Sequence, residues 1–546
     1  RQMCIRDSLK GDQMLIQILL LFSFVAIACV LCNKLTNRVG IPMLLAFLGV
    51  GMLCGTDGLL GISFENDAIC EQVSTVALIF IIFYGGFGTK WSEAKPVAGR
   101  SVLLSTVGVF LTAGLVGGFC HFVLHMQWLE ALLTGSVLSS TDAASVFSIL
   151  RSKRLNLKDG TASLLEVESG SNDPVAFLMT TVILTMMTDG MSVGTVLYLI
   201  FAQIAYSIFI GVGLAWLTVQ FLKRFHFETS GFDMIFLLAV AVLSYALPVL
   251  IGGNGYLSAY IAGIILGNAR IPNKKKQVPF FDGVTGLMQM LLFFILGLFA
   301  TPSRLPSVLL PALVIAGFLT ILARPIVVGV LLTPFRARLR QQLLVSWSGL
   351  RGATSAVFAV TALASGVALE QDLFHTVFCV VLLSIAIQGT LLPACAKKLD
   401  MIDEDGDVLK TFTDYTEEQE LQLIQFPIAS GSAWAGKAVR ELILPPETLL
   451  VMLIRGTETM IPKGDTMVQE GDTAVLSASA YRDDHRIHLC ELEIQPTHAW
   501  CGREIRELTL PSEELIILIR RGTQSLIPQG NLKIQSGDVL VMNATE

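Results

Sequence analysis

Charged residues are scarce in this sequence. Lys, Arg, Asp and Glu make up 15% of its 546 residues, against 53% hydrophobic ones, whereas soluble domains average about 25% charged residues. This composition excludes a wholly soluble or disordered chain. The charges are also unevenly placed, because residues 401–546 hold 12 Lys and Arg against 24 Asp and Glu. An acidic tail therefore follows an apolar, mildly basic body, and nucleic acid is not an expected partner because phosphate binding needs a basic face.

The sequence also lacks the short motifs of pumps and common enzymes. It contains no GxxxxGK[ST] phosphate loop, no GxGxxG dinucleotide turn and no compact cluster of His and Cys. Most of the ten cysteines lie in apolar runs, where a thiol packs as a small hydrophobic group. We therefore expect no enzymatic activity, no cofactor and no resident metal.

Long apolar runs fill the chain from residue 14 to about residue 400. A membrane-spanning helix needs about 20 apolar residues, and residues 1–13 are expected to be a leader outside the native fold. The runs predict about thirteen transmembrane helices, at 14–33, 41–55, 70–88, 98–124, 128–150, 160–187, 193–222, 231–250, 254–269, 279–300, 306–334, 341–366 and 371–395.

The loops between these runs predict the orientation. Basic residues gather in alternate loops, for example at 90–100, 151–158 and 270–276, whereas the opposite loops hold only Arg304. Cytoplasmic loops are the ones enriched in Lys and Arg. We expect a multi-pass protein of a bacterial-type cell membrane, with the N-terminus outside and the acidic tail in the cytoplasm.

Six ionisable residues fall inside the expected spans. A charged group at mid-bilayer costs ~2.5–3.5 kcal/mol on insertion scales, and its default interpretation is functional. Structural ion pairs are the alternative, but four acids against two bases favour an ion or proton pathway. The six residues are Asp142, Glu166, Glu168, Asp173, Arg324 and Arg351.

Two of the expected spans are interrupted by small and polar residues. Residues 139–144 read Ser-Ser-Thr-Asp-Ala-Ala, and residues 346–355 read Ser-Trp-Ser-Gly-Leu-Arg-Gly-Ala-Thr-Ser. In transporters such stretches unwind and present carbonyl groups and half-helix ends to a cation near the membrane midplane. In the span between them, Ser169 and Asp173 lie four residues apart and share one helical face.

Asp173 has the chemistry of an exchange site. Hydroxyl, carbonyl and carboxylate oxygens suit an alkali cation, and burial makes a carboxylate hold a proton more readily because it disfavours the charged form. The side chain then holds a proton or a cation but not both, which together with alternating access is sufficient for antiport. The neighbouring Asn172 is neutral, so one proton for one monovalent cation predicts electroneutral exchange.

Four short motifs occur in order along the apolar part: Thr141-Asp142, Asn172-Asp173 after Glu168, Ala323-Arg324-Pro325 and Gly349-Leu350-Arg351-Gly352. Over residues 14–400 this pattern resembles the monovalent cation:proton antiporters of the NhaP/sodium–proton exchanger family, of the potassium/proton type. The resemblance implies a polytopic α-helical membrane protein with inverted repeats and two broken, crossed helices. It also implies a homodimer that exports K⁺ or Na⁺ in exchange for H⁺ and serves pH homeostasis.

The resemblance assigns roles to the site residues. Asp173 would carry the ion or proton, with Ser169 and Thr141 as ligands, and Asn172 would join the two broken segments. The implied ion-binding set is Asp173, Asn172, Ser169, Thr141 and Asp142.

The remaining buried charges are expected to form structural ion pairs. The resemblance pairs Glu168 with Arg324 and Asp142 with Arg351, although the two arginines are interchangeable at this stage. Breaking such a buried pair would leave a costly bare charge.

The tail contains an internal repeat. The segment from Ala433 recurs from Ala499 with a constant offset of 66 residues and no gap. Each copy reads as a short helix followed by strands and glycine turns, and resembles the C-terminal ligand-sensing domain (TrkA-C) of potassium-conductance regulators. We expect an acidic linker over 401–424 and α+β TrkA-C-like domains at 425–484 and 485–546. A cyclic dinucleotide or another small anion would bind between them; a folding or dimerisation module is the alternative.

A potassium channel gated by such a tail is the main rival function. Residues 84–88 read Tyr-Gly-Gly-Phe-Gly and superficially resemble a selectivity filter, but no TVGYG loop is present. The oxygen ligands suit Na⁺ and K⁺ alike, and the regulator-type tail favours K⁺ by resemblance. An electroneutral K⁺ (or Na⁺)/H⁺ antiporter is therefore the predicted function.

Overall fold

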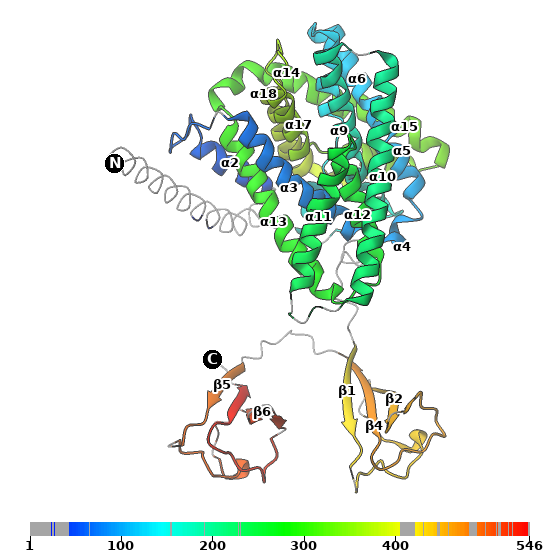
Figure 1. The fold of residues 1–546 in the computed structure, drawn as a ribbon, viewed down its shortest axis with the longest axis vertical. Coiled ribbons are helices and arrows are strands. Elements are labelled where there is room, and N and C mark those ends of the chain that lie inside the picture. Colours follow the sequence, from blue (N-terminus) through cyan, green and yellow to red (C-terminus); the bar gives the residue numbers. More distant parts are fainter. Residues whose placement is uncertain are drawn as a thin grey trace, which may run out of the picture. The chain divides into compact units, whose positions relative to one another are not determined.

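The structure is a computed structural model that describes residues 43–403 and 421–543 apart from short gaps, together with Ser23 and Ile27. The chain divides into two compact units, residues 1–415 and residues 416–546 (Figure 1). The expected leader, the first expected span at 14–33 and most of the expected linker lie outside the described residues.

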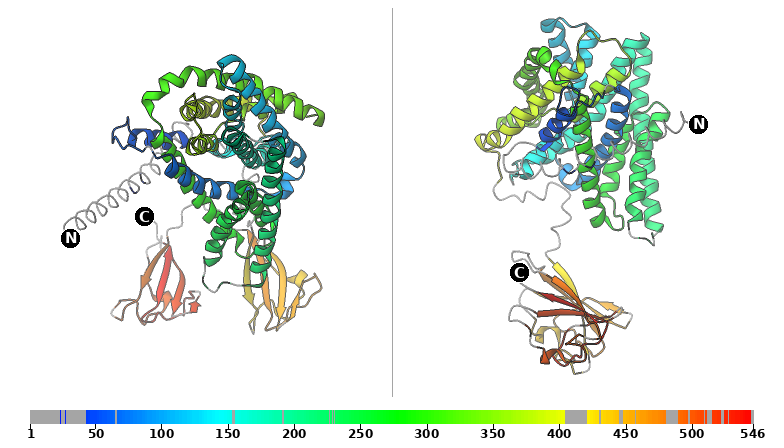
Figure 2. Two further views of the ribbon diagram at one scale, coloured as in Figure 1. Left: turned by 45° about the horizontal axis from the view of Figure 1, so that its top comes forward. Right: turned by 90° about the vertical axis from the view of Figure 1, so that its left-hand side faces the viewer.

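The described part of the first unit is built mainly from helices, and Figure 2 views them from two further directions. Its helices are α2 (Met43–Cys54), α3 (Asp67–Gly88), α4 (Trp91–Ala94), α5 (Ala98–Ser105), α6 (Val107–Leu124), α7 (Trp128–Val137), α8 (Ala143–Ser152), α9 (Thr161–Asp189), α10 (Val193–Arg224), α11 (Phe232–Leu250), α12 (Gly255–Asn268), α13 (Lys274–Phe299), η1 (Pro302–Arg304), α14 (Leu305–Phe318), η2 (Leu319–Ala323), α15 (Arg324–Leu332), η3 (Thr333–Phe335), α16 (Leu339–Trp347), α17 (Ala353–Ala364), α18 (Leu373–Leu383), η4 (Ser384–Gly389) and α19 (Thr390–Lys398).

These helices reproduce the expected spans from 41–55 onward, as single helices or as two or more in line. Seven described helical segments are long and apolar enough to cross a membrane, and α2 and α17 are shorter apolar helices. The expected spans 128–150 and 341–366 are each split, into α7 and α8 and into α16 and α17. The prediction of a polytopic helical membrane protein with two broken helices is confirmed.

Two long helices are widened locally into π-helical turns. The turn η2 lies between α14 and α15, immediately before Arg324, and η4 lies between α18 and α19. Such turns usually occur as short bulges inside α-helices and are frequent at functional sites. Here one of them precedes a buried arginine and the other faces the break between α16 and α17, as described below.

Helix α9 runs through the interior of the bundle and packs against α5, α7 and α12, among others (Figure 1). Helix α12 in turn packs closely on α3, because Gly263 and Gly267 bring its backbone against the carbonyls of Phe83 and Phe87. A side chain at either glycine would overlap α3. Small residues give this kind of close contact between membrane helices.

The second unit contains two four-stranded antiparallel sheets of the same strand order, β1-β4-β2-β3 and β5-β8-β6-β7. Each also has a short 3-10 helix, η6 (Val439–Glu441) or η7 (Ile505–Glu507). The strands are β1 (Leu421–Pro427), β2 (Leu449–Arg455), β3 (Glu458–Met460), β4 (Thr473–Ser479), β5 (Leu489–Glu493), β6 (Leu515–Arg521), β7 (Gln524–Leu526) and β8 (Val539–Asn543).

The two sheets also share their irregularities. Pairing of β2 with β4 shifts by one residue between Leu450 and Met452, and pairing of β6 with β8 shifts between Ile516 and Leu518. These two positions are related by the same 66-residue offset as the sequence repeat. The predicted tandem of α+β units is therefore present in detail.

Candidate functional site

The two interrupted helices meet at their breaks. Residues 138–142 separate α7 from α8, and residues 348–352 separate α16 from α17. The backbone N–H of Asp142 donates to the carbonyl of Leu350 at 2.8 Å. Because one break bonds directly to the other, the expected crossing of two broken helices is confirmed.

Arg351 joins the crossing to its neighbours. Its guanidinium is fully buried and donates through Nη1 to the carbonyls of Ser139 (2.9 Å) and Ser140 (2.5 Å). Its backbone N–H donates to the hydroxyl of Ser384 in η4 at 2.9 Å. A cation at these carbonyls, just beyond the C-terminal end of α7, is favourably placed for the dipole of that half-helix.

Asp142 has a well-defined role at the start of α8. The carboxylate of Asp142 accepts a bond from the backbone N–H of Ser145 at 3.1 Å and another from its hydroxyl. It thereby caps the first turn of α8, which is the ordinary use of an aspartate before a helix. Arg351 bonds to the carbonyl groups of Ser139 and Ser140, so its pairing with Asp142 stays a prediction.

The other expected pair is present. Arg324 donates through Nη2 to Oε1 of Glu168, and both side chains are almost completely buried, at 3% and 1% exposure. Gly349 makes room for the arginine, because a Cβ at that position would lie 2.7 Å from Nε of Arg324. The structure therefore decides between the two arginines and ties α9 to α15.

Asp173 lies on α9 with each carboxylate oxygen bonded to a different interrupted helix. Oδ1 accepts from the hydroxyl of Ser140, in the first break. Oδ2 accepts from the hydroxyl of Thr354, the second residue of α17, at 3.1 Å. Asp173 is 8% exposed and Thr354 is 9% exposed. The carboxylate is thus buried, held by hydroxyls and close to the N-terminal end of a half-helix, which favours negative charge.

The residues implied as ligands form a second group beside Asp173. The amide Nδ2 of Asn172 donates to the hydroxyl of Thr141 at 2.5 Å, and the hydroxyl of Ser169 donates to the carbonyl of Thr141. Both contacts tie α9 to the first break, and the expected role of Asn172, to join the two broken segments, stays a prediction. The amide oxygen Oδ1 of Asn172 is buried and, within the described part of the chain, accepts no hydrogen bond.

Sequence reasoning did not single out the two hydroxyls that contact Asp173. Ser140 and Thr354 stand in the polar stretches that predict the breaks, so composition places them near the site but does not rank them. Ser384 had no such signal, because it is a single serine in an apolar run. It bonds to Oε1 of Gln388 at 2.5 Å within η4. Glu166, which the sequence did single out, is buried on α9.

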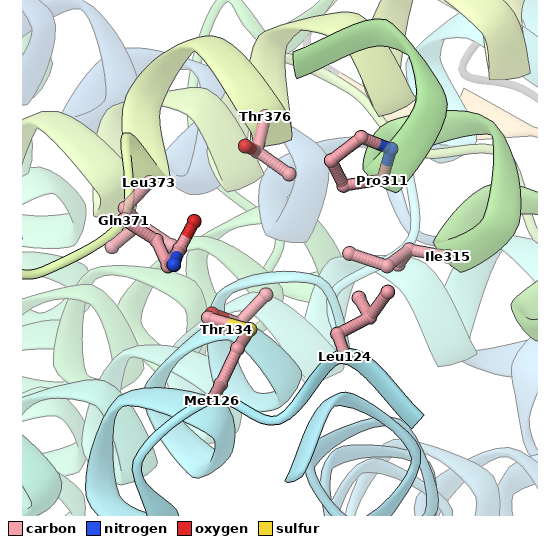
Figure 3. Close-up of a pocket in the computed structure, with 8 residues that line it drawn as sticks. All are labelled: Leu124, Met126, Thr134, Pro311, Ile315, Gln371, Leu373 and Thr376. Atoms are coloured by element: carbon pink, nitrogen blue, oxygen red, sulfur yellow. The ribbon is translucent and has the colours of Figure 1, made fainter. Parts of the chain in front are cut away.

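A separate cavity of about 100 Å³ lies among α6, α7, α14 and α18 (Figure 3). Its walls are mainly apolar, with the polar side chains of Thr134, Gln371 and Thr376, and they include none of the residues that contact Asp173. The cavity is therefore distinct from the carboxylate site. Its lining residues are Leu124, Met126, Thr134, Pro311, Ile315, Gln371, Leu373 and Thr376.

Two family models match this chain. Residues 20–398 match the transmembrane sodium/hydrogen exchanger model, and residues 423–480 and 489–545 each match the TrkA-C domain model. Both matches agree with the helical first unit and with the two sheets of the second.

Named relatives and solved structures give the same result. The K(+)/H(+) antiporter NhaP of Alkalimonas amylolytica is 33% identical over 454 residues, which cover 82% of this chain and 78% of the relative. The K(+)/H(+) antiporter NhaP2 of Shewanella sp. (strain ANA-3) is 32% identical with the same coverage. The structure of the sodium proton antiporter MjNhaP1 from Methanocaldococcus jannaschii at pH 8 superposes with a TM-score of 0.61 at 25% identity, covering 68% of this chain and 99% of that one.

Proposed function

Because this chain belongs to the sodium/hydrogen exchanger family, we propose that it exchanges K⁺ for H⁺ across the membrane and that Asp173 carries the two in turn. The observation that supports the proposal is the position of Asp173: one buried carboxylate at the crossing of two broken helices, bonded to both. The names of the two relatives support K⁺ as the cation. Na⁺ is the alternative, since it suits the same oxygen ligands.

Exchange follows from competition at this carboxylate. Burial disfavours the bare charge, so the side chain takes either a proton or a cation when no water surrounds it. Asn172 beside it carries no charge, and Glu168, five residues earlier on α9, is already paired with Arg324. Only one charge is then exchangeable, so one proton replaces one monovalent cation and no net charge moves.

The neighbouring residues hold the site together in this proposal. Asn172, Ser169 and Thr141 fix α9 against the first break, and in this proposal their oxygen atoms contribute to the cation site at Asp173. Asp142 acts as the cap of α8 and keeps that half-helix in place. Arg351 stabilises the crossing through the carbonyls at the end of α7.

The orientation, assembly and regulation belong to the proposal as well. The loop charges support an N-terminus outside and a tail in the cytoplasm. We propose a homodimer, and control of the membrane unit by a small anionic ligand at the TrkA-C domains. Membership of the exchanger family supports an antiporter and not the alternative of a potassium channel, so the chain is a transporter.

The test is exchange in everted membrane vesicles that contain a pH-sensitive dye. K⁺ or Na⁺ is added to vesicles with an imposed proton gradient, for the wild type, for Asp173→Asn and for Asp233→Asn. Asp233 is a matched control, because it is a buried acid on α11 that accepts a bond from Gln277 at 3.1 Å. We expect loss of exchange in the first variant only, with normal amounts of folded protein; full exchange by Asp173→Asn contradicts the proposed carrier.

A further inference from the structure

The hydroxyls that touch Asp173 are not those that the family resemblance implies. Thr141 and Ser169 bond to neighbours on α9 and in the first break, whereas Ser140 and Thr354 donate to the carboxylate itself. A hydroxyl that donates a hydrogen bond to a carboxylate still has lone pairs on its oxygen atom. Each of these two hydroxyls can therefore contact a cation seated on Asp173 without releasing its bond to the carboxylate.

We propose that Thr354 and Ser140 complete the oxygen shell of the transported cation and that Thr354 sets its selectivity. The inference rests on the proposed function, because it takes Asp173 as the cation carrier. The shell then draws one hydroxyl from each interrupted helix, so its size depends on the separation of the two breaks. That separation is fixed by the bond from Asp142 to the carbonyl of Leu350 and by the contacts of Arg351. Hard oxygen ligands at a set spacing are the means by which a site distinguishes alkali cations.

The geometry makes Thr354 the more informative of the two. Its hydroxyl belongs to a regular helix, so valine replaces it with nearly the same shape, whereas Ser140 lies in an irregular break. Thr361 provides a matched control on the same helix, because its hydroxyl bonds to the carbonyl of Val357 at 3.1 Å, within its own helix. Thr354→Ser is the conservative variant that keeps the hydroxyl.

The experiment measures exchange in everted vesicles as a function of K⁺ and of Na⁺ concentration. For Thr354→Val we expect the apparent KM for K⁺ to rise roughly tenfold, the factor for one polar contact, and the ratio of K⁺ to Na⁺ transport to change. Thr354→Ser should restore the KM for K⁺, and Thr361→Val should match the wild type.

The outcomes separate this inference from the proposed function. A normal KM and a normal ion ratio in Thr354→Val, with Asp173→Asn inactive, overturn the inference and leave the carrier in place. Activity in Asp173→Asn overturns both. If Thr354→Val does not reach the membrane folded, Ser140→Ala is measured in its place, and a variant that only lowers thermal stability contradicts a ligand role.

A second feature links the residues that lead into the tail, just after α19, to the helices of the site. The loop between α8 and α9 pairs with the chain just after α19: Leu157 and Ile402 form an antiparallel bridge, with Lys158 N–H bonded to Met401 at 2.9 Å and Asp403 N–H bonded to Asn156 at 3.0 Å. We call this contact the clasp.

Side chains reinforce the clasp. Asp400 accepts from Lys158 at 3.1 Å and from Arg340 at 2.9 Å, and the side chain of Met401 is buried in the core beside this loop. The loop connects α8, capped by Asp142, with α9, which bears Asp173. The residues that lead into the tail are therefore bonded directly to the connection between two helices of the site.

From this contact we infer that the tail controls exchange through the clasp, by pulling on residues 401–403 and so shifting the loop between α8 and α9. The inference rests on the proposed regulation by the tail. Asp403→Pro removes the N–H that bonds to Asn156, and Asp403→Ala keeps it and serves as the control. A protease site inserted after Gly406 allows the tail of the assembled protein to be severed in everted vesicles.

Severing the tail should change the exchange rate of the wild type and of Asp403→Ala, and should leave the rate of Asp403→Pro within about twofold of its uncut value. An equal change in all three shows that the tail acts by another route and overturns the inference. No change in the wild type also overturns it, while exchange by the uncut protein still supports the proposed antiport, and Asp173→Asn remains the test of the carrier.

Discussion

At the scale of single residues, the site depends on positions where no side chain fits. Gly352 lies against the carboxylate of Asp142, and an added Cβ there would overlap that side chain. Gly349 makes similar room for Arg324. The glycines of the Gly-Leu-Arg-Gly motif thus allow the second break to approach an acid of the first break and an arginine of α15.

Gly352→Ala should therefore reduce exchange strongly and lower the stability of the protein by about 1–3 kcal/mol, the usual cost of overpacking. Gly317→Ala on α14 is the control, because an added Cβ there meets no atom within 4 Å. The measurements are vesicle exchange and the thermal unfolding midpoint in detergent. Equal behaviour of the two variants would show that the close approach at Gly352 is unimportant.

The limits of sequence reasoning are clearest for the buried charges. The acids and arginines stand out because charge is rare in an apolar helix, so their participation is predictable. The sequence does not predict which of the two arginines pairs with Glu168, because both lie far from it along the chain. Only the packing of α9 against α15 determines the partner. Asp142 also has a local partner, Ser145, three residues on, and it bonds to the backbone N–H of that residue.

At the scale of elements, the sequence predicts interrupted helices but not widened ones. Small polar residues in the middle of two spans predict the breaks at 138–142 and 348–352. The π-helical turns η2 and η4 add a residue to a helical turn without changing its apolar character, so no compositional signal marks them. The strand order of the tail sheets is similarly a result of long-range pairing, although the repeat itself is evident.

Each tail sheet has an ion pair at the same place, between a partly exposed arginine and a buried aspartate. Arg455 donates to Asp472 through Nε (2.8 Å) and Nη2 (2.7 Å), and Arg521 donates to Asp538 in the same way at 2.8 Å. The arginine bonded to it holds the pKa of each of these carboxyls below its ordinary value of 3.8. Each pair joins the turn before the last strand of its sheet to the neighbouring strand.

These carboxyls should make the tail sensitive to acid. Because their pKa is lower in the folded state, the stability that they contribute is fully present above pH 4 and is lost as the pH falls through the folded-state pKa. Asp472→Asn should speed hydrogen exchange in β4 at pH 7, by the loss of a charged hydrogen bond of about 1.5–3 kcal/mol, and leave β8 unchanged. If the rate of amide hydrogen exchange rose equally in both sheets, the two sheets would not unfold separately.

At the scale of the whole molecule, a single exchangeable charge has an electrical consequence. If Asp173 alone trades one proton for one monovalent cation, the exchange rate should not respond to the membrane potential. Vesicles with a thiocyanate gradient of either direction provide the potential, and the dye reports the rate. A rate that follows the sign of the potential would mean that a second acid releases its proton, with Glu166 the first to substitute.

The two sheets of the tail share an irregularity that bears on how the repeat arose. Each contains a one-residue slip in strand pairing, at Leu450 to Met452 in one and at Ile516 to Leu518 in the other. Two unrelated strands have no reason to acquire the same defect at equivalent positions. Because the slip recurs at the 66-residue offset of the sequence repeat, we infer that a single module was duplicated with this bulge already in place.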